Sequence, residues 1–268
     1  DILRLWVASV DYQSDVRISN DMMKQVSESY RKIRNTIRFM LGNISDFNPQ
    51  TDRVEFDQLV EVDQYVRVQL NTLVKESLEH YDNFEFDSVY RDITNFVTRE
   101  LSAFYLDFTK DILYITKPDD HARRSVQTVL YDVTLSLLQL LTPYLPHTTH
   151  EAYKHLPYRA FSDMYLENMP EVLDVDGTQL VKTYEAFMQV RDNVNKALEE
   201  ARNKQIIGKS FSAKLTIYPN KELRALLDRM NVNIGQLFIV SAFEIKEGTG
   251  AYTFQNMSVD VEKAEGDT

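Results

Sequence analysis

The 268-residue sequence contains no cysteine, which excludes disulfide bonds, thiolate zinc sites and cysteine nucleophiles. Glycine and proline, the residues that most often interrupt regular structure, number only 7 each, so long helices are favoured. The longest apolar runs, such as 237–240, are far shorter than the roughly 18–20 residues that a membrane-spanning helix needs. The first residues also lack the pattern of a secretory signal. We therefore expect a cytoplasmic protein without a membrane segment.

The composition is that of a globular protein with a substantial core. Hydrophobic residues make up 43% of the chain and charged residues 26%. The length allows one large domain or two unequal ones. A net charge of -11 argues against a nucleic-acid partner, unless the basic residues are gathered on one face.

The first part of the chain carries the 3.6-residue period of amphipathic helices. A short apolar helix is expected within 1–10, followed by a polar connection. Four longer helices follow, and their apolar stripes lie at 26–41, 59–73, 89–108 and 126–140. Pro143 and Pro146 mark the end of the last stripe. These lengths predict a mainly α fold, with an antiparallel, up-and-down helical bundle over 1–156.

The hydrophobic period changes in the second part of the chain. The turn-rich stretch 157–178, which contains Pro157, Pro170 and Gly177, is expected to be a linker. A small α/β module is expected over 179–268. Its predicted parts are a helix at 179–204, a strand at 213–217, a short helix at 222–230, strands at 237–245 and 252–261, and a polar tail at 260–268.

The patterns that resemble catalytic or metal sites do not hold up. His147, His150 and His155 lie close in sequence, but the H-E-x-x-H order of a zinc site is absent, and a solvated helix start explains them better. The run 207–210 resembles the end of a phosphate-binding loop, yet the required glycine is replaced by Asn203. We expect no catalytic residue, no metal and no cofactor in this chain.

Basic residues gather in one place. Between Arg17 and Arg38 the chain has six basic residues against two acidic ones. Arg31, Arg34 and Arg38 fall on one side of a helix beside its apolar stripe, with Asn35 near them. Guanidinium groups in such a row could follow a phosphate backbone. The alternative is a solvated face whose arginines pair with acids of the following loop, namely Asp46, Asp52, Glu55 and Asp57.

Six blocks of sequence, in order, resemble class I aminoacyl-tRNA synthetases for branched aliphatic amino acids. They are 1–9 (DILRLWVAS), 30–36 (YRKIRNT), 101–106 (LSAFYL), 110–114 (KDILY), 123–130 (RRSVQTVL) and 143–149 (PYLPHTT). The stretch 190–202, continuing through 207–210, is most similar to the isoleucyl-tRNA synthetases. Valyl and leucyl relatives share the bundle and remain an alternative.

This resemblance implies an anticodon-binding domain that grips the anticodon stem-loop of isoleucine tRNA. The family signatures for catalysis, H-I-G-H and K-M-S-K-S, are absent, as are the cysteines of the family's terminal zinc module. The resemblance therefore implies that ATP and magnesium are used elsewhere in a parent ligase, and that this segment lies between the catalytic domain and the zinc module. A monomer is expected.

The resemblance also selects candidate RNA-binding residues. The first group is Arg31, Arg34, Asn35 and Arg38, and a second group is Arg202, Lys204 and Lys209. Three further basic residues could instead be structural and pair with nearby acids: Lys110, Arg123 and Arg124. Two other classes of protein stay open: a helical scaffold that binds protein, and a metal-dependent hydrolase built on His147 and His150.

Overall fold

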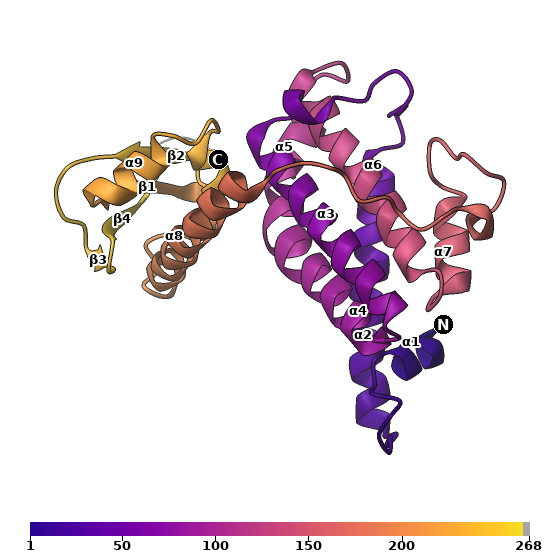
Figure 1. The fold of residues 1–268 in the computed structure, drawn as a ribbon. Helices are drawn as coiled ribbons and strands as arrows, with labels where there is room; N and C mark the ends of the chain where they lie inside the picture. The colour runs from indigo at the N-terminus through magenta and orange to yellow at the C-terminus, as the bar shows by residue number, and fades with distance from the viewer. Residues whose placement is uncertain (265–268) are drawn as a thin grey trace. The chain divides into compact units, whose positions relative to one another are not determined.

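The computed structural model describes residues 1–264, and the chain separates into two compact units (Figure 1). The first unit covers Asp1–Val175 and the second begins at Asp176. Most of the stretch expected to be a linker, 157–175, belongs to the first unit. One reason is that Asn71 holds it: its side-chain amide donates to the Leu173 carbonyl at 2.9 Å and accepts from the Leu173 N–H at 2.7 Å.

The first unit is the predicted bundle. Consecutive long helices run in alternating directions in Figure 1. The elements are α1 (Ile2–Ala8), α2 (Asn20–Asn43), η1 (Phe56–Gln58), α3 (Glu61–Asp82), α4 (Phe86–Asn95), the π-helix η2 (Phe96–Tyr105), α5 (Leu106–Ile115), α6 (His121–Leu141), α7 (Pro146–Tyr153) and η3 (Met164–Leu166). Residues 86–115 thus form one continuous helix. The sequence pattern did not predict the π-helical conformation of its middle part.

Helix boundaries in this unit follow from capping. Ser19 accepts a hydrogen bond from the Met22 N–H at the start of α2, and Asp120 accepts from the Ala122 N–H at the start of α6. Pro146 occupies the first turn of α7, where its missing N–H costs nothing.

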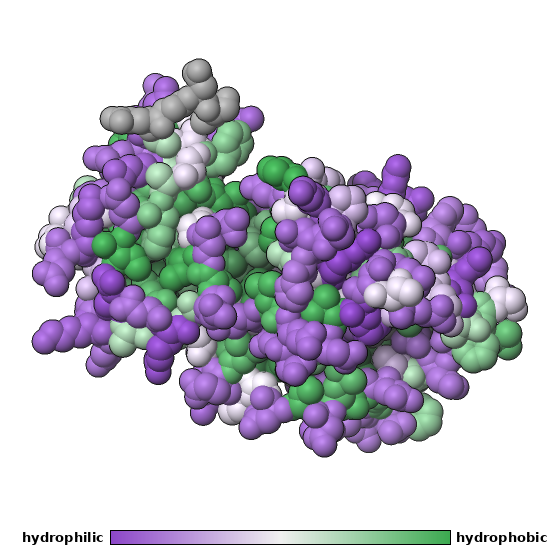
Figure 2. Space-filling view, turned by 90° about the horizontal axis from the view of Figure 1, so that it is seen from above, coloured by the Kyte–Doolittle hydropathy of each residue, from purple (hydrophilic) through white to green (hydrophobic). Residues whose placement is uncertain are grey.

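Apolar stripes of the bundle helices meet in one core. Leu70, Leu101, Leu130 and Leu137, from α3, η2 and α6, are fully buried. Hydrophilic side chains dominate the face seen in Figure 2, with apolar patches between them. No helix within residues 1–264 has the length and apolar character that crossing a membrane requires.

The second unit is a small mixed sheet with helices. Its elements are α8 (Thr178–Asn203), η4 (Ser210–Ser212), β1 (Ala213–Pro219), α9 (Lys221–Leu227), α10 (Ile234–Phe238), β2 (Ala242–Ile245), β3 (Tyr252–Thr253) and β4 (Met257–Lys263). The strand order is β2-β1-β4-β3, in which β1 pairs parallel with β2 and antiparallel with β4. The fully buried Phe187 and Val194 of α8, Leu215 of β1 and Val259 of β4 supply its core.

Three strand predictions need correction. The stretch predicted as a strand at 237–245 begins as the end of α10, because Asn233 caps that helix and a short apolar run fits a buried helix as well as a strand. The stretch 252–261 forms two strands, since residues 254–256 make the turn between β3 and β4. The prediction of a polar tail from residue 260 is wrong for residues 260–263, because they belong to β4 and pair with β1. Residues 265–268 lie outside the described part.

Candidate nucleic-acid interface

Helix α2 presents its basic residues to solvent. Ile33 and Ile37 are buried against the bundle, which fixes the helix rotation. The four predicted RNA-binding residues of this helix are consequently all exposed: Arg31, Arg34, Asn35 and Arg38. The structure therefore places them together along one helix, as the sequence predicted.

These arginines are not used in ion pairs. Within residues 1–264, neither Arg31, Arg34 nor Arg38 has an acidic partner within ion-pair distance. The loop acids that could have neutralised them are occupied elsewhere. Asp46 lies 3.1 Å from Arg123 Nη2, and Asp52 lies 3.4 Å from Arg124 Nη2. The alternative in which the loop acids pair with the α2 arginines is thus excluded for Asp46 and Asp52.

Arg123 and Arg124 are structural residues of α6. Besides their ion pairs, Arg124 Nη1 donates to the Asp46 carbonyl at 3.1 Å. Burial would raise the pKa of Asp46, but hydrogen bonds from Gln127 and Arg123 outweigh this and hold the pKa below its usual value. Lys110 pairs with Asp107 at 2.6 Å, as the sequence suggested, whereas the partners of the two arginines come from the loop after α2 and not from their own neighbourhood.

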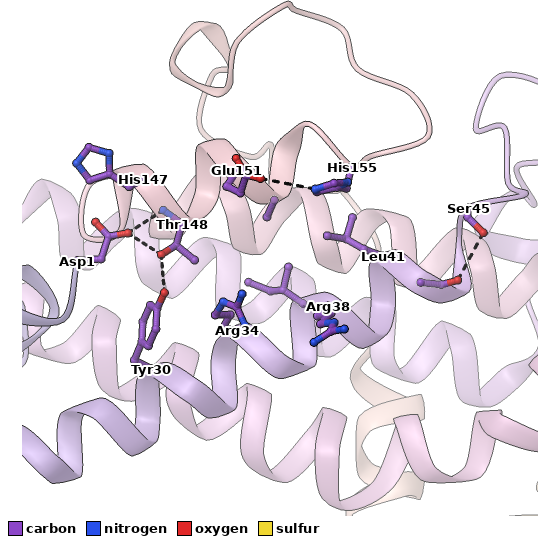
Figure 3. Close-up of a pocket in the computed structure, with 13 residues that line it drawn as sticks. Asp1, Tyr30, Arg34, Arg38, Leu41, Ser45, His147, Thr148, Glu151 and His155 are labelled. Carbon is purple, nitrogen blue, oxygen red and sulfur yellow. Dashed lines mark hydrogen bonds and ion pairs between the residues drawn. The ribbon is translucent and has the colours of Figure 1, made fainter.

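A groove with a volume of about 750 Å³ lies between α2 and α7 (Figure 3). Arg34 and Arg38 line it from α2, His147 and Glu151 line it from α7, and His155 lines it from just after α7. Glu151 lies 3.3 Å from Lys154 Nζ, so part of its charge is compensated. The groove therefore combines two guanidinium groups with two imidazole rings and two carboxylates, those of Asp1 and Glu151.

The position of α7 beside α2 is set by hydrogen bonds at its first turn. The Asp1 carboxylate accepts from the Thr148 N–H at 2.7 Å and from its hydroxyl at 2.6 Å. Tyr30 Oη of α2 lies 3.0 Å from the same hydroxyl. The contribution of α7 was not predicted, although residues 147, 151 and 155 are four apart each time, a spacing that favours one helical face.

The histidines do not assemble a metal site. His150 points away from the groove: its Nδ1 lies 3.2 Å from Asp163, and its ring stacks on Tyr165 with centroids 5.3 Å apart. In the described part of the chain, no three His, Asp or Glu side chains are arranged to hold a metal ion. The arrangement gives no support to the hydrolase alternative.

A second hollow, of about 440 Å³, lies on the other side of the same arginine row. Asn35, Arg38 and Gly42 line it from α2, and Tyr114 lines it from α5. Tyr114 is 66% exposed and was not among the predicted RNA-binding residues. The signal was available, because Tyr114 lies in the 110–114 block and outside the apolar stripe of its helix.

The second predicted group of basic residues lies in the other unit and is partly engaged. Arg202 Nη2 donates to Ser210 Oγ at 3.3 Å, and Lys204 pairs with Glu200 at 3.4 Å. Lys209 Nζ lies 5.3 Å from the ring centre of Phe211. All three basic residues remain exposed. They form a smaller and less available basic surface than α2.

Comparison with known proteins gives a family and several relatives. The family described as "Anticodon-binding domain of tRNA ligase" matches residues 63–217. The chain is 50% identical to "Isoleucine--tRNA ligase" of Listeria monocytogenes and of Streptococcus thermophilus, and 49% identical to that of Bacillus mycoides. Each comparison covers 100% of this chain but only 29–30% of the relative. The chain thus spans under a third of the length of these relatives, and α2 lies within their similarity but before the family match.

Proposed function

The chain belongs to the anticodon-binding domain family of tRNA ligases, and from this membership we propose that it binds the anticodon stem-loop of isoleucine tRNA. Relatives of about 50% identity that are named isoleucine–tRNA ligases support the choice of isoleucine tRNA. The whole protein would then be an ATP-dependent isoleucine–tRNA ligase. In it, this chain selects the tRNA, acts as a monomer and takes no part in the chemical step.

The observation that carries the proposal is the row of arginines on α2, which have no acidic partner among residues 1–264. A guanidinium without a carboxylate partner keeps its donors for a phosphate, and it loses less on binding than one that must first break an ion pair. Arg31, Arg34 and Arg38 repeat at one to two helical turns, so they can contact successive phosphates of one strand. Asn35 lies between them and offers an amide to a base edge or a sugar.

The groove between α2 and α7 gives the RNA backbone a path. Its cationic wall is formed by Arg34 and Arg38, and the opposite wall by polar side chains of α7. Arg202, Lys204 and Lys209 of the second unit would add a weaker contact, because Lys204 must first release Glu200.

Binding to transcripts tests the proposal directly. Fluorescence anisotropy should give tighter binding to isoleucine tRNA than to a tRNA for another amino acid. The advantage should disappear when the anticodon stem-loop is deleted from the isoleucine transcript. Equal affinity for all three RNAs would contradict anticodon recognition.

A triple substitution tests the residues. Changing Arg31, Arg34 and Arg38 to Gln should weaken binding. It should also lower the steepness of log affinity against log salt by roughly two to three units, because fewer phosphate contacts form and fewer counterions are released on binding. Helix α2 should stay folded, because Gln is a good helix former and the three positions are exposed.

The matched control removes the same charge elsewhere. Arg91, Arg99 and Arg159 are also exposed, and changing them to Gln should leave the salt slope unchanged. Circular dichroism would check folding of both variants. If the α2 variant leaves the salt slope unchanged, the phosphate contacts do not lie on α2, and Arg202, Lys204 and Lys209 become the residues to change.

A further inference from the structure

The hollow beside Tyr114 has a lining unlike that of the groove. Its residues provide two aromatic rings, two amides and one guanidinium, and no carboxylate: Asn35, Arg38, Phe39, Gly42, Asn43 and Tyr114. Within residues 1–264, the Tyr114 ring and hydroxyl and the Asn35 amide make no hydrogen bond or ring contact. The Tyr114 ring and the Asn35 amide are therefore available to a ligand, whereas the Asn43 amide already donates to the Phe39 carbonyl at 2.8 Å.

Both walls of this hollow are tied to α6. Arg123 Nη1 donates to the Leu113 carbonyl, next to Tyr114, and Arg123 Nη2 donates to Asp46 at 3.1 Å. Gln127 Nε2 donates to the Asn43 carbonyl at 2.9 Å, at the end of α2. One turn of α6 thus fixes the end of α5 and the end of α2 together. Tyr114 stands on a pre-organised support, although its own side chain is exposed.

We propose that this hollow takes one unstacked nucleobase of the anticodon loop, with Tyr114 as its stacking surface. The inference rests on the proposed function and adds a base-reading subsite to it. A single exposed aromatic residue means little by itself. Here the ring lies beside an amide that can bond to a base edge and a guanidinium that can hold the nucleotide's phosphate. A bare anion would use only Arg38, and an acidic peptide would not need the ring.

The experiment compares side chains at position 114 in the full chain. Tyr114→Leu removes the ring and should weaken binding to isoleucine tRNA by roughly five- to a hundredfold. Tyr114→Phe keeps the ring and should bind within about threefold of the wild type. The salt slope should stay unchanged in both variants, because no charge is lost.

The matched control is Ile115→Ala. Ile115 is 78% exposed on the same helical turn but does not line the hollow, so its truncation should not change binding. Circular dichroism should show that all three variants are folded.

A double-mutant cycle identifies the base. Each position of the anticodon loop is replaced in turn by an abasic nucleotide, and wild type and Tyr114→Leu are measured on each RNA. At one position the effect of Tyr114→Leu should vanish, since the base that it stacks on is already absent. If the wild type binds but Tyr114→Leu has no effect, or its effect adds at every position, the subsite is wrong while the proposed function stands. If the wild type itself does not prefer isoleucine tRNA, the proposed function fails first.

Discussion

Asp63 lies wholly inside the bundle, where a carboxylate is costly. Tyr105 Oη donates to it at 2.6 Å, and Ser125 Oγ donates to its other oxygen. Burial raises the pKa of Asp63 to about 6, and the two hydrogen bonds only limit the rise. The three residues connect α3, the π-helix η2 and α6, so the protonation state of one side chain affects the middle of the bundle.

The stability of the bundle should therefore depend on pH through Asp63. Below about pH 4 the Asp63 carboxyl is protonated in both the folded and the unfolded state, and its contribution to the free energy of unfolding is fully present. As the pH rises toward 6, the unfolded chain ionises first, so this contribution is lost. The free energy of unfolding of wild type minus that of Asp63→Asn should fall by roughly 2–3 kcal/mol between pH 4 and 6.5. Urea unfolding across this pH range measures the difference. Parallel pH profiles of wild type and Asp63→Asn would show that the ionisation of Asp63 does not affect stability.

Asp132 is a second buried carboxylate, but it is paired. Arg53 donates to both of its oxygens at 2.7 and 3.0 Å, and Arg67 Nε donates at 2.9 Å. Asp132→Asn removes the carboxylate that both guanidinium groups contact and should lower the free energy of unfolding by about 3 kcal/mol. The control is Asp107→Asn, whose pair with Lys110 is about half exposed and should contribute less than about 1 kcal/mol. Similar losses in chemical denaturation would mean that burial does not matter for this pair.

At the scale of single elements, the end of α8 shows how a backbone conformation is tied to the second basic group. Gln205 has φ 58°, and the Ile206 N–H donates to the Ala201 carbonyl at 2.9 Å. This is the reversal that ends many helices, at the position where glycine is usual. It turns the chain between Lys204 and Lys209.

Glycine at this position should stabilise the second unit. Gln205 is exposed, so Gln205→Gly loses no packing and relieves the left-handed conformation. We expect a gain of about 0.5–1 kcal/mol in the free energy of unfolding. Gln205→Ala keeps a Cβ in the same conformation and should give no gain. Equal effects of Gly and Ala in denaturant titrations would show that the conformation carries no strain.

Elements with a strong period could be predicted from sequence, and those decided by tertiary contacts could not. The apolar stripes of α2, α3 and α6 predicted these helices, because one buried face imposes a 3.6-residue spacing. The run 237–240 is apolar throughout, so no period distinguished the end of α10 from a strand. The π-helix η2 lies between α4 and α5, and no pattern in the sequence that we could identify signals it.

The candidate site, too, could be predicted from sequence only in part. The exposure of Arg31, Arg34 and Arg38 followed from their place beside an apolar stripe. Whether they were paired could not be predicted, because Asp46 and Asp52 lie in the loop that follows α2. In the structure these two acids pair with arginines of α6 instead. The part played by Tyr114 depends on α5 ending next to α2, which is a property of the tertiary fold.

At the scale of the whole molecule, the net charge of -11 must be reconciled with the polyanionic partner that we propose. Exposed charges are screened beyond roughly 8–10 Å at physiological salt. The acids elsewhere on the chain therefore act weakly on a phosphate held at α2, whereas an acid paired with an arginine of α2 would act directly. The lining of the Tyr114 hollow contains no acid, and that of the groove includes Asp1 and Glu151. Local pairing, and not the total charge, decides whether this protein can bind RNA.

Two separate cores also predict how the whole chain unfolds. The core of the first unit includes Leu70 and Leu137, and that of the second includes Phe187 and Leu215. Since each unit buries its own apolar residues, we expect two thermal transitions in scanning calorimetry.

The two stability variants assign these transitions. Asp132→Asn acts in the first unit and should lower one midpoint by roughly 6–12 °C, because about 3 kcal/mol is lost from a unit of this size. Gln205→Gly acts in the second unit and should raise the other midpoint by roughly 2–8 °C. Each variant should leave the remaining transition in place, and the double variant should show both shifts added, since the sites share no partner. One transition that moves with both substitutions would show instead that the units unfold as a single cooperative body.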